Sequence, residues 1–525
     1  MSNLGFQSVY NLFNSIDDVV CERVFLPEKV DRDEFIRSGT RLFSLESQRP
    51  LDAFDLLAFS IPFEEDFLHV PEILRLAALP VFSRERGDGH PLVMAGGVAL
   101  SLNPEPLAEF IDLFAIGEGE SFLPSFVDVF RDCGGKRREG LLDEMAAVEG
   151  VYVPSLYNVE YDDGRIAGMT PLRGAPEKVT KAAPLKLDAC RTPQSYITTS
   201  ETEFGNTFLI EVERGCGRGC RFCAAGFVYL PMRERGIGGI QESVARGGEI
   251  TGKVGLVGAA VSEYEGLKDI VRSAVERGGK VTLSSLRMDM LDGELLDLLK
   301  AGGYETITLA PEAGSQRMRD VINKGLSDRE IMDAVSLVRD GGFNKVKLYF
   351  LVGLPTEGRE DIEAILDLAR RVRGLLTKGE VTLSVNPFIP KPWTPFQWAP
   401  YEEMGRLGNK LAAITKGCAR MRGVRVKTYS PRIGYLQALL SRGDRRVAPV
   451  VEGEDGKGWR TFMKRIADPD RYVYRERGYD ETLPWDIIDH GIQKEYLWNE
   501  YERGLKGRIT SPCDVGRCFR CGVCT

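Results

Sequence analysis

The sequence contains few histidines and no long apolar segment. Only three of its 525 residues are histidine, so any metal chemistry has to rely mainly on sulfur ligands. No apolar run reaches the roughly 20 residues that a membrane-spanning helix needs. The N-terminal residues lack the basic and then apolar layout of a signal peptide, and no tract is of low complexity. These absences predict a folded protein of the cytoplasm without a membrane segment.

The length predicts about two to four domains, and residues 1–150 have the pattern of the first. We expect a helix over residues 3–14 and strands over residues 19–26, 56–61, 91–95 and 113–116. Apolar strands that alternate with helices are typical of an α/β fold with a doubly wound parallel sheet. Such a domain normally begins with a central strand, whereas this chain begins with a helix. Either the true start lies upstream or the domain lacks its first strand; we favour the former, because the loss would expose two strand edges.

Residues 151–200 have the composition of a linker with a short β-hairpin around Asp162, Asp163 and Gly164. A second repeat of strands and helices follows in residues 201–430. Its strands are expected at residues 207–213, 254–260, 281–286, 306–311, 346–352 and 381–387. One helix opens with the capping box Ser327-x-x-Glu330. These units predict a partial (β/α)6 barrel, and residues 431–525 are expected to form a less regular C-terminal extension.

The eleven cysteines are better explained as metal ligands, catalytic groups or core residues than as disulfides, because the cytoplasm is reducing. Four are isolated and are expected to be small buried hydrophobic residues, namely Cys21, Cys133, Cys190 and Cys418. The other seven fall into two tight groups.

The first group, Cys216, Cys220 and Cys223, forms a C-x3-C-x2-C loop directly after the first predicted barrel strand. Active sites of parallel barrels lie at the carboxyl ends of the strands. Glycines at positions 215, 217 and 219 would let the backbone wrap around a cluster and direct amide groups at it. Three thiolates can bind three irons of a 4Fe–4S cluster and leave the fourth iron open. A zinc loop is the alternative, but zinc sites usually show paired C-x2-C units and four ligands.

This loop resembles the C-x3-C-x-aromatic-C signature of the radical S-adenosylmethionine (SAM) superfamily, with Phe222 as the aromatic residue. The resemblance implies a TIM-barrel-like core in which the three cysteines hold a 4Fe–4S cluster and SAM chelates its open iron. Reduction by a donor such as flavodoxin or ferredoxin would then cleave SAM to a 5′-deoxyadenosyl radical that abstracts hydrogen from a substrate. The cofactor performs this step, so no catalytic side chain is assigned.

Further segments resemble the SAM-binding strand ends of this superfamily. The usual Gly-Gly-Glu stretch is replaced here by Gly-Ala-Ala at residues 258–260. The resemblance therefore implies a SAM-binding set made of Gly258, Ala259, Ser262, Glu263, Ser284, Arg287 and Glu312. Each of these residues is equally well explained as a helix cap or a surface ion pair.

Residues 1–130 resemble the cobalamin-binding-type N-terminal domain of some radical SAM proteins, and the chain is most similar to an uncharacterised family of that group. Cobalamin itself is not favoured, because the D-x-H-x-x-G loop that supplies a histidine to cobalt is missing. The glycine turns at residues 96–97 and 117–119 would receive a corrin or are simply tight connections. Methylthiotransferases are similar in domain order, but their three additional N-terminal cysteines are matched only by Cys21 and Cys133.

The second group, Cys513, Cys518, Cys521 and Cys524, has the spacing C-x4-C-x2-C-x2-C. This spacing resembles that of ferredoxins and suits a second Fe–S cluster, which would pass electrons or bind substrate. Zinc is the alternative, since four thiolates also make a closed tetrahedral site. We favour the Fe–S cluster.

Two further segments carry expectations about partners. The net charge of −8 does not favour nucleic acid in general, but one stretch is basic and is opposed only by Asp444. Its members are Lys416, Arg420, Arg422, Arg425, Lys427, Arg432, Arg442, Arg445 and Arg446. This stretch is either an RNA-facing surface or an ordinary solvated face. The proline- and aromatic-rich residues 388–398 predict an extended loop that lines the substrate pocket or packs as a lid.

The sequence thus predicts a radical SAM enzyme whose substrate is unidentified, with RNA or a ribosome-associated protein as candidates. One alternative is a cobalamin-dependent methylase of the same superfamily. Another is an Fe–S or zinc protein that interacts with RNA and has lost catalysis. The altered Gly-Ala-Ala stretch favours this last alternative, and the intact cysteine loop opposes it. Oligomeric state is not predicted.

Overall fold

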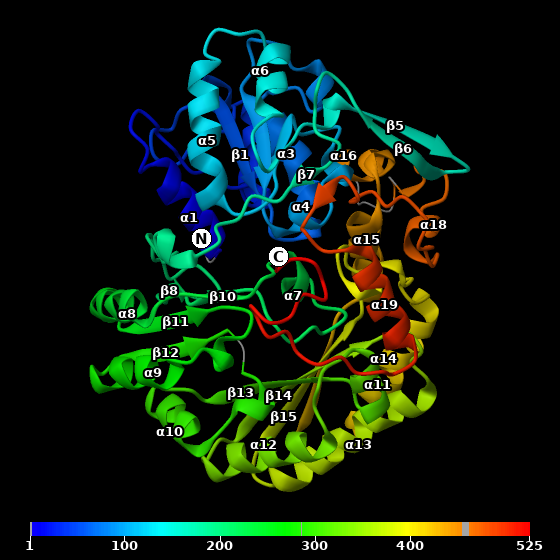
Figure 1. Ribbon diagram of the computed structural model, residues 1–525. Helices are drawn as coiled ribbons and strands as arrows, with labels where there is room; N and C mark the ends of the chain where they lie inside the picture. The colour runs from blue at the N-terminus through cyan, green and yellow to red at the C-terminus, as the bar shows by residue number, and fades with distance from the viewer. Residues whose placement is uncertain (1–2, 285, 454–460, 462, 525) are drawn as a thin grey trace. The chain divides into compact units, whose positions relative to one another are not determined.

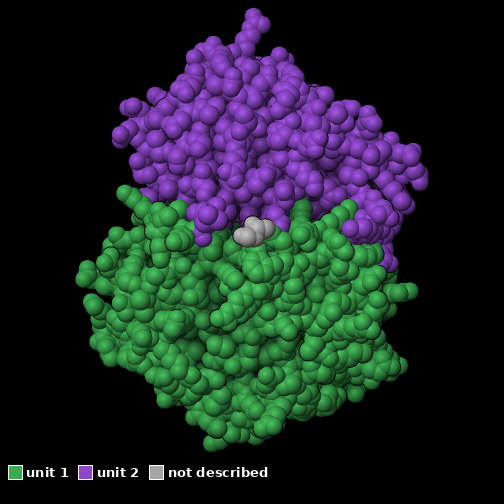
Figure 2. Space-filling model, in the orientation of Figure 1, with its two compact units in different colours: residues 1–7, 186–435, 492–525 green, residues 8–185, 436–491 purple. Residues whose placement is uncertain are grey.

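The computed structural model describes residues 3–284, 286–453, 461 and 463–524. The chain forms two compact units, which are coloured separately in Figure 2. Unit 1 comprises residues 1–7, 186–435 and 492–525, and unit 2 comprises residues 8–185 and 436–491. Each unit is therefore assembled from segments that are distant in sequence. The domain boundaries that we placed near residues 150, 200 and 430 remain a prediction.

Unit 2 is built on a four-stranded sheet whose strands follow one another in chain order (Figure 1). Its strands are β1 (Leu56–Ser60), β2 (Leu92–Gly96), β3 (Leu113–Ala115) and β4 (Val151–Tyr152). β1, β2 and β3 are parallel, whereas β4 pairs antiparallel with β3. The expected α/β fold with parallel strands is confirmed. The winding differs from the expectation. The strands of this sheet follow chain order, whereas a doubly wound sheet reverses its strand order at an internal strand.

Helices and short strands make up the rest of this unit. The helices are α1 (Leu4–Phe13), whose residues up to Gln7 belong to unit 1, α2 (Lys29–Ser38), α3 (His69–Leu76), α4 (Val98–Leu102), α5 (Gly119–Asp132), α6 (Arg138–Met145), α16 (Ala448–Glu452) and α18 (Asp470–Val473). The expected hairpin is present as β5 (Tyr157–Asp162) and β6 (Arg165–Pro171), and β7 (Val179–Thr180) pairs with β17 (Ile488–Asp489).

The strand expected at residues 19–26 is wrong. This segment has no regular secondary structure. Its backbone groups bond to a nearby loop instead, since the Arg23 N–H donates to the Glu46 carboxylate and the Arg23 carbonyl accepts from the Leu45 N–H. These contacts replace the ladder of hydrogen bonds that a strand would need.

The glycine turns of unit 2 make room for the protein's own backbone. Gly97 has a φ of 126°, and a Cβ there would collide with the carbonyl of Ile61. Gly117 has a φ of 125°, and a Cβ there would collide with the carbonyl of Ala182. Both glycines are therefore explained by tight chain packing, and whether this unit binds a corrin remains untested.

Unit 1 contains the strands of the predicted barrel in two parallel sheets (Figure 1). The first sheet has the order β12 (Lys280–Leu283), β11 (Lys253–Val257), β8 (Phe208–Glu211). The second has the order β13 (Thr306–Glu312), β14 (Lys345–Val352), β15 (Glu380–Pro387), β16 (Val424–Thr428). Every expected barrel strand is present. β16 was not expected, because basic residues alternate along this edge strand and it lacks a buried apolar run.

Helices follow most of these strands, as a barrel of βα units requires. They are α7 (Ala225–Val228), α8 (Ile237–Thr251), α9 (Leu267–Glu276), α10 (Gly293–Ala301), α11 (Gln316–Val321), α12 (Asp328–Asp340), α13 (Arg359–Leu375), α14 (Met404–Cys418) and α19 (Lys494–Leu505). The helix α15 (Pro431–Arg442) begins in unit 1, and its residues from Leu436 onward belong to unit 2. The capping box is confirmed, since Ser327 and Glu330 bond reciprocally at the start of α12. Among the described residues, no helix is both long and apolar enough to cross a membrane.

Residues 388–398 pack against α19 in the interior of unit 1. Phe396 and Trp398 are fully buried. The Trp398 ring meets Trp498 edge-on at a centroid distance of 5.0 Å, and Phe396 meets Tyr501 in the same way at 6.2 Å. Aromatic pairs of this kind add to the stability that area burial provides. These two rings therefore pack in the core of unit 1. That the loop lines the substrate pocket or packs as a lid remains a prediction.

Part of the predicted basic surface is wrong. Arg442 is buried and donates to the backbone carbonyls of residues 473 and 475. Arg445 binds the buried Glu105, and Arg446 binds Asp444. All of these partners belong to unit 2. The exposed members of the basic stretch are all in unit 1, namely Lys416, Arg420, Arg422, Arg425, Lys427 and Arg432.

Candidate functional site

The first cysteine group lies in the loop between β9 (Glu213–Arg214) and α7, just after the first barrel strand. β9 pairs antiparallel with β10 (Arg233–Glu234), which closes the loop at its base. The backbone can turn this tightly only with glycine. Gly215 has a φ of 89°, and a Cβ there would lie 2.7 Å from the carbonyl oxygen of Tyr229. Gly219 also has a positive φ, of 68°.

The three thiols of this loop are close enough to influence one another. The pKa of Cys216 is raised to about 12, mainly by burial and to a smaller extent by the neighbouring Cys220 and Cys223. Burial also raises the pKa of Cys220 and of Cys223, while the cation of Lys324 acts in the opposite direction on both. Desolvated thiols grouped beside a cation fit a 4Fe–4S cluster, whose irons replace the thiol protons.

The arrangement does not resemble a site for one ion. In the described part of the chain, no three His, Cys, Asp or Glu side chains form a group that could hold a single metal ion. The sulfurs around one zinc lie about 2.3 Å from the metal and therefore within about 4 Å of one another. Cysteines that each bind a different iron of a cluster stand further apart.

Arg218, inside the cysteine loop, joins several residues that were expected to bind SAM. Its Nε donates to Glu263 Oε1 at 2.7 Å, and Arg287 Nε lies 3.2 Å from the same oxygen. Asp289 contacts both guanidinium groups, at 3.5 Å from Arg218 and 3.0 Å from Arg287. Ser262 Oγ accepts from the Arg287 N–H at 3.0 Å. The structure thus connects Ser262, Glu263 and Arg287 to the cysteine loop.

The other expected SAM-binding residues lie at neighbouring strand ends. Ser284 Oγ donates to the Gly258 carbonyl at 2.8 Å and accepts from its N–H at 3.2 Å, and Ala259 follows directly. Glu312 ends β13 and forms a 3.2 Å ion pair with Lys324. Sequence reasoning missed Lys324 and Arg218, because neither stands at a predicted strand end. That these residues bind SAM remains a prediction.

Glu213 is a further residue that sequence reasoning missed. Its side chain is 2% exposed. One carboxylate oxygen accepts from the Ala260 N–H, and the other has no hydrogen-bond partner among the described residues. Burial raises the pKa of Glu213 to about 7, against the effect of the Ala260 bond and with the help of nearby carboxylates such as Glu234 and Glu263. An acidic residue in an apolar strand, three positions before the first cysteine, was the available signal.

The second cysteine group lies beside the first within unit 1. The Cys513 N–H donates to the Gly217 carbonyl at 2.6 Å. Arg520 Nε donates to the Cys518 sulfur at 3.2 Å, and this bond lowers the pKa of Cys518. Burial raises the pKa of Cys513 to about 11. The two groups are therefore parts of one region, although about 300 residues separate them in sequence.

Comparison with known proteins identifies the family. Residues 5–154 match the family model described as radical SAM proteins, N-terminal, and residues 210–369 match the model of the radical SAM superfamily. An uncharacterized protein of Methanocaldococcus jannaschii is 30% identical over 413 residues, which cover 78% of this chain and 83% of that protein. The chain belongs to the radical SAM superfamily, a class of enzymes that use a 4Fe–4S cluster and SAM.

More distant relatives carry names of specific activities. A putative methylthiotransferase of the same organism is 24% identical, over 64% of this chain and 66% of that protein. A tRNA-2-methylthio-N(6)-dimethylallyladenosine synthase of Anaplasma marginale is 26% identical, over 36% of this chain and 44% of the synthase. Among solved structures, the cobalamin-dependent SAM radical enzyme OxsB gives a TM-score of 0.45 at 15% identity and covers 70% of this chain. This chain spans about half the length of OxsB, 49%.

Proposed function

We propose that this chain cleaves SAM reductively at a 4Fe–4S cluster held by Cys216, Cys220 and Cys223, and so activates a C–H bond of a substrate. The observation that carries this proposal is the grouping of three buried or half-buried thiols on one glycine-supported loop at the carboxyl end of a parallel strand. Family membership supplies the cofactors. When bound, the cluster and SAM supply a 5′-deoxyadenosyl radical.

The side chains around the loop would hold SAM in place. Arg218 and Arg287 carry guanidinium groups, which bind carboxylates well, and both contact Glu263. Arg218 lies in the cysteine loop, and Arg287 follows β12. Glu213 and Glu263 supply carboxylates for the SAM amino group. The Glu213 oxygen without a partner is a suitable acceptor, because a buried carboxylate gains most from a cation brought next to it. A soluble one-electron donor of the flavodoxin or ferredoxin kind would supply the electron.

RNA is the substrate class that we propose to test first. The tRNA-modifying synthase among the relatives supports it, as do the six exposed members of the basic stretch, which all lie in unit 1. Binding to phosphates would weaken steeply as salt increases. The test is RNA binding at two salt concentrations, and we expect Arg422→Glu/Arg425→Glu to weaken it. The control is Arg359→Glu, a change of an exposed residue at the start of α13 and outside the basic stretch. If neither the salt concentration nor the double substitution changes RNA binding, this surface does not bind RNA.

The experiment for SAM cleavage measures release of 5′-deoxyadenosine from SAM by anaerobically reconstituted, dithionite-reduced protein. We expect Cys220→Ala to abolish release, a fall of at least about 100-fold, because one iron loses its ligand. Cys418→Ala is the matched control, since Cys418 is an isolated buried cysteine of the same unit. The Cys418→Ala protein should keep its iron content and its release of 5′-deoxyadenosine.

A second readout separates binding from turnover. Addition of SAM to the reduced protein should change the electron paramagnetic resonance (EPR) signal of the cluster, and this change should disappear in Cys220→Ala. Unchanged release by the Cys220→Ala protein would disprove the proposal.

A further inference from the structure

The C-terminal cysteine segment is fastened to the first cysteine loop. The Cys513 N–H donates to the Gly217 carbonyl at 2.6 Å, and the position of a Cβ on Gly217 lies 3.1 Å from the Cys513 carbonyl oxygen. Cys216, Cys513, Cys518 and Cys521 line one small cavity of about 20 Å³. Cysteines of both groups therefore face the same space.

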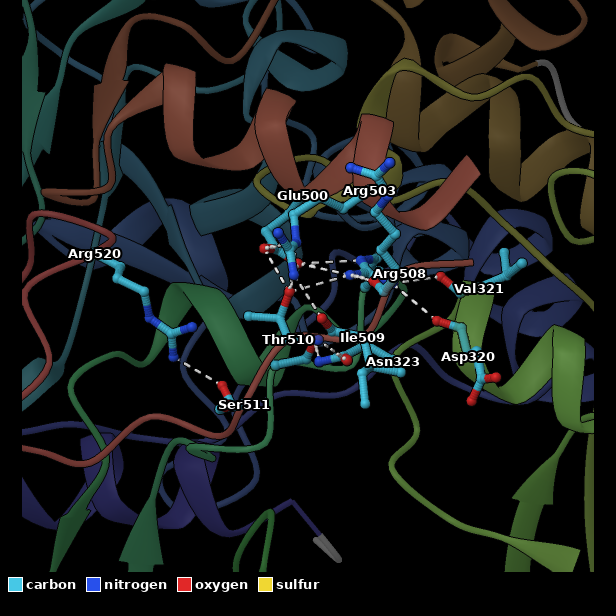
Figure 3. A network of polar contacts seen from close by, with 12 residues as sticks. Asp320, Val321, Asn323, Glu500, Arg503, Arg508, Ile509, Thr510, Ser511 and Arg520 are labelled. Atoms are coloured by element: carbon cyan, nitrogen blue, oxygen red, sulfur yellow. Dashed lines mark hydrogen bonds and ion pairs between the residues drawn. The ribbon is translucent and has the colours of Figure 1, made fainter. Parts of the chain in front are cut away.

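Arg221, which stands between the second and third cysteines of the first loop, anchors the segment. Its guanidinium is fully buried and lies 2.9 Å from a Glu500 carboxylate oxygen. It also donates to the Arg508 carbonyl at 2.7 Å and to Thr510 Oγ1 at 3.3 Å. Figure 3 shows Glu500, Arg508 and Thr510 close to one another, and each of them bonds to Arg221. A buried guanidinium needs all its donors satisfied, so the segment has little freedom to move away.

A second clamp holds the other side of the loop. Asn323 donates to the Gly219 carbonyl at 3.1 Å and accepts from the Thr510 N–H at 2.8 Å. Further along, Arg520 donates to the Ser511 carbonyl at 2.8 Å (Figure 3) and to the Cys518 sulfur at 3.2 Å. These contacts join the first loop, the residues that follow α11 and the C-terminal segment, as far as Cys518, into one connected network.

We infer that Cys513, Cys518, Cys521 and Cys524 hold a second Fe–S centre that passes electrons to the cluster of the first loop. This inference rests on the proposed function. The spacing C-x4-C-x2-C followed by a fourth cysteine is typical of Fe–S ligation. A cationic donor to sulfur, here Arg520, stabilises a reduced centre, which carries more negative charge. A structural zinc would need no shared cavity with the first group.

The closeness of the two cysteine groups supports a role of the second centre in electron transfer. Electron transfer slows steeply with distance, and the two groups are joined by a direct backbone hydrogen bond. A flavin or Fe–S donor protein would lose one electron to the second centre. That centre would return to its oxidised state when it reduces the first cluster by one electron. No bond or proton changes place in either transfer, and the electron is consumed when the C–S bond of SAM breaks.

The test uses the full-length chain and compares Cys524→Ser and Cys518→Ser with the wild-type protein and with Cys418→Ser. After anaerobic reconstitution, each of the two test variants should lose about two to four irons per chain, depending on whether the centre is a 2Fe–2S or a 4Fe–4S cluster. One EPR species should disappear, while the species that responds to SAM remains. Cys418→Ser should keep the wild-type iron content.

The relay is measured as a ratio of rates. SAM cleavage driven by reduced flavodoxin is divided by cleavage driven by dithionite, which can reduce the first cluster without the relay. The ratio should fall at least about 10-fold in both test variants, which is about 1.4 kcal/mol of barrier, and should stay constant in Cys418→Ser. Because two variants are used and folding is checked by circular dichroism, loss of the fold is recognised separately.

Two results would overturn the inference. One is about one zinc and no extra iron bound per wild-type chain. The other is an unchanged ratio in variants that have lost the second set of irons. Failure of the proposed function looks different, since SAM cleavage would then be absent with both reductants even in the wild-type protein.

Discussion

The two cysteine groups of unit 1 reach similar surroundings by different means. The first group follows a barrel strand and is shaped by its own glycines and by the β9–β10 pair. The second lies on an irregular segment, where Cys513, Cys518 and Cys524 are half-buried and only Cys521 is buried. Its position depends on side chains of distant elements, above all Arg221 and Asn323. Local geometry therefore builds one site, and long-range polar contacts build the other.

One residue belongs to both sites. Arg221 is part of the first loop by sequence, yet its guanidinium donates hydrogen bonds to Glu500 of α19 and to the C-terminal segment. Gly504 of α19 makes this possible, because a Cβ there would lie 2.9 Å from Arg221 Cδ. Substitution of Arg221 should disturb both cysteine groups, whereas substitutions elsewhere should affect only one of them.

Arg221→Met should have the largest effect on stability. It leaves the Glu500 carboxylate buried with fewer donors, and breaking a buried ion pair in this way costs about 3–5 kcal/mol. We expect a lower melting temperature of apo-protein in calorimetry and loss of iron from both groups. Arg359→Met, which breaks an exposed pair on α13, should change the unfolding free energy by less than about 0.5 kcal/mol. If Arg221→Met removes iron only from the second group, the first loop does not depend on the anchor.

Glu213→Gln should show how strongly the first site is desolvated. Burial raises the pKa of Glu213 to about 7, above the unfolded value of about 4.3. The neutral carboxyl is therefore tolerated at low pH, and its ionisation destabilises the fold as pH rises toward 7. Relative to wild type, the glutamine variant should gain on the order of 3 kcal/mol between pH 5 and pH 8.

Unfolding of apo-protein by urea at pH 5 and pH 8 measures this gain. Glu305→Gln is the control, because Glu305 is exposed and the Lys345 partner lowers its pKa, so it does not titrate in this range. A gain that is equal at both pH values would show that Glu213 is not desolvated in the folded protein.

Gly217→Ala should have the smallest effect and should separate the two groups. The new methyl would stand 3.1 Å from the Cys513 carbonyl oxygen, a close contact that small shifts of the segment can relieve at about 1 kcal/mol. Iron of the second group should fall and that of the first should persist. Gly478→Ala, where no heavy atom lies within 4 Å of the new methyl, is the control. Equal losses from both groups would contradict the independence of the first loop.

Patterns with short range in sequence were predicted well. Period-two strands, the capping box before α12 and the glycine-rich cysteine loop all depend on residues a few positions apart. Errors arose where apolar pattern and structure diverge. Residues 19–26 are apolar enough for a strand but bond to a loop, and β16 is a strand in spite of its charges. The order of strands in unit 2 depends on connections that composition does not encode.

The sequence alone determined the family signature, the ligand type and the α/β class, because cysteine spacing, glycine and hydrophobic period act locally. Tertiary structure decided which groups meet. The Arg221–Glu500 contact joins residues 279 positions apart, Glu213 reaches the altered Gly-Ala-Ala stretch only through strand pairing, and Arg445 turns inward to a buried Glu105. Such contacts form only when burial makes an unpaired charge too costly, and no local pattern in the sequence records that cost.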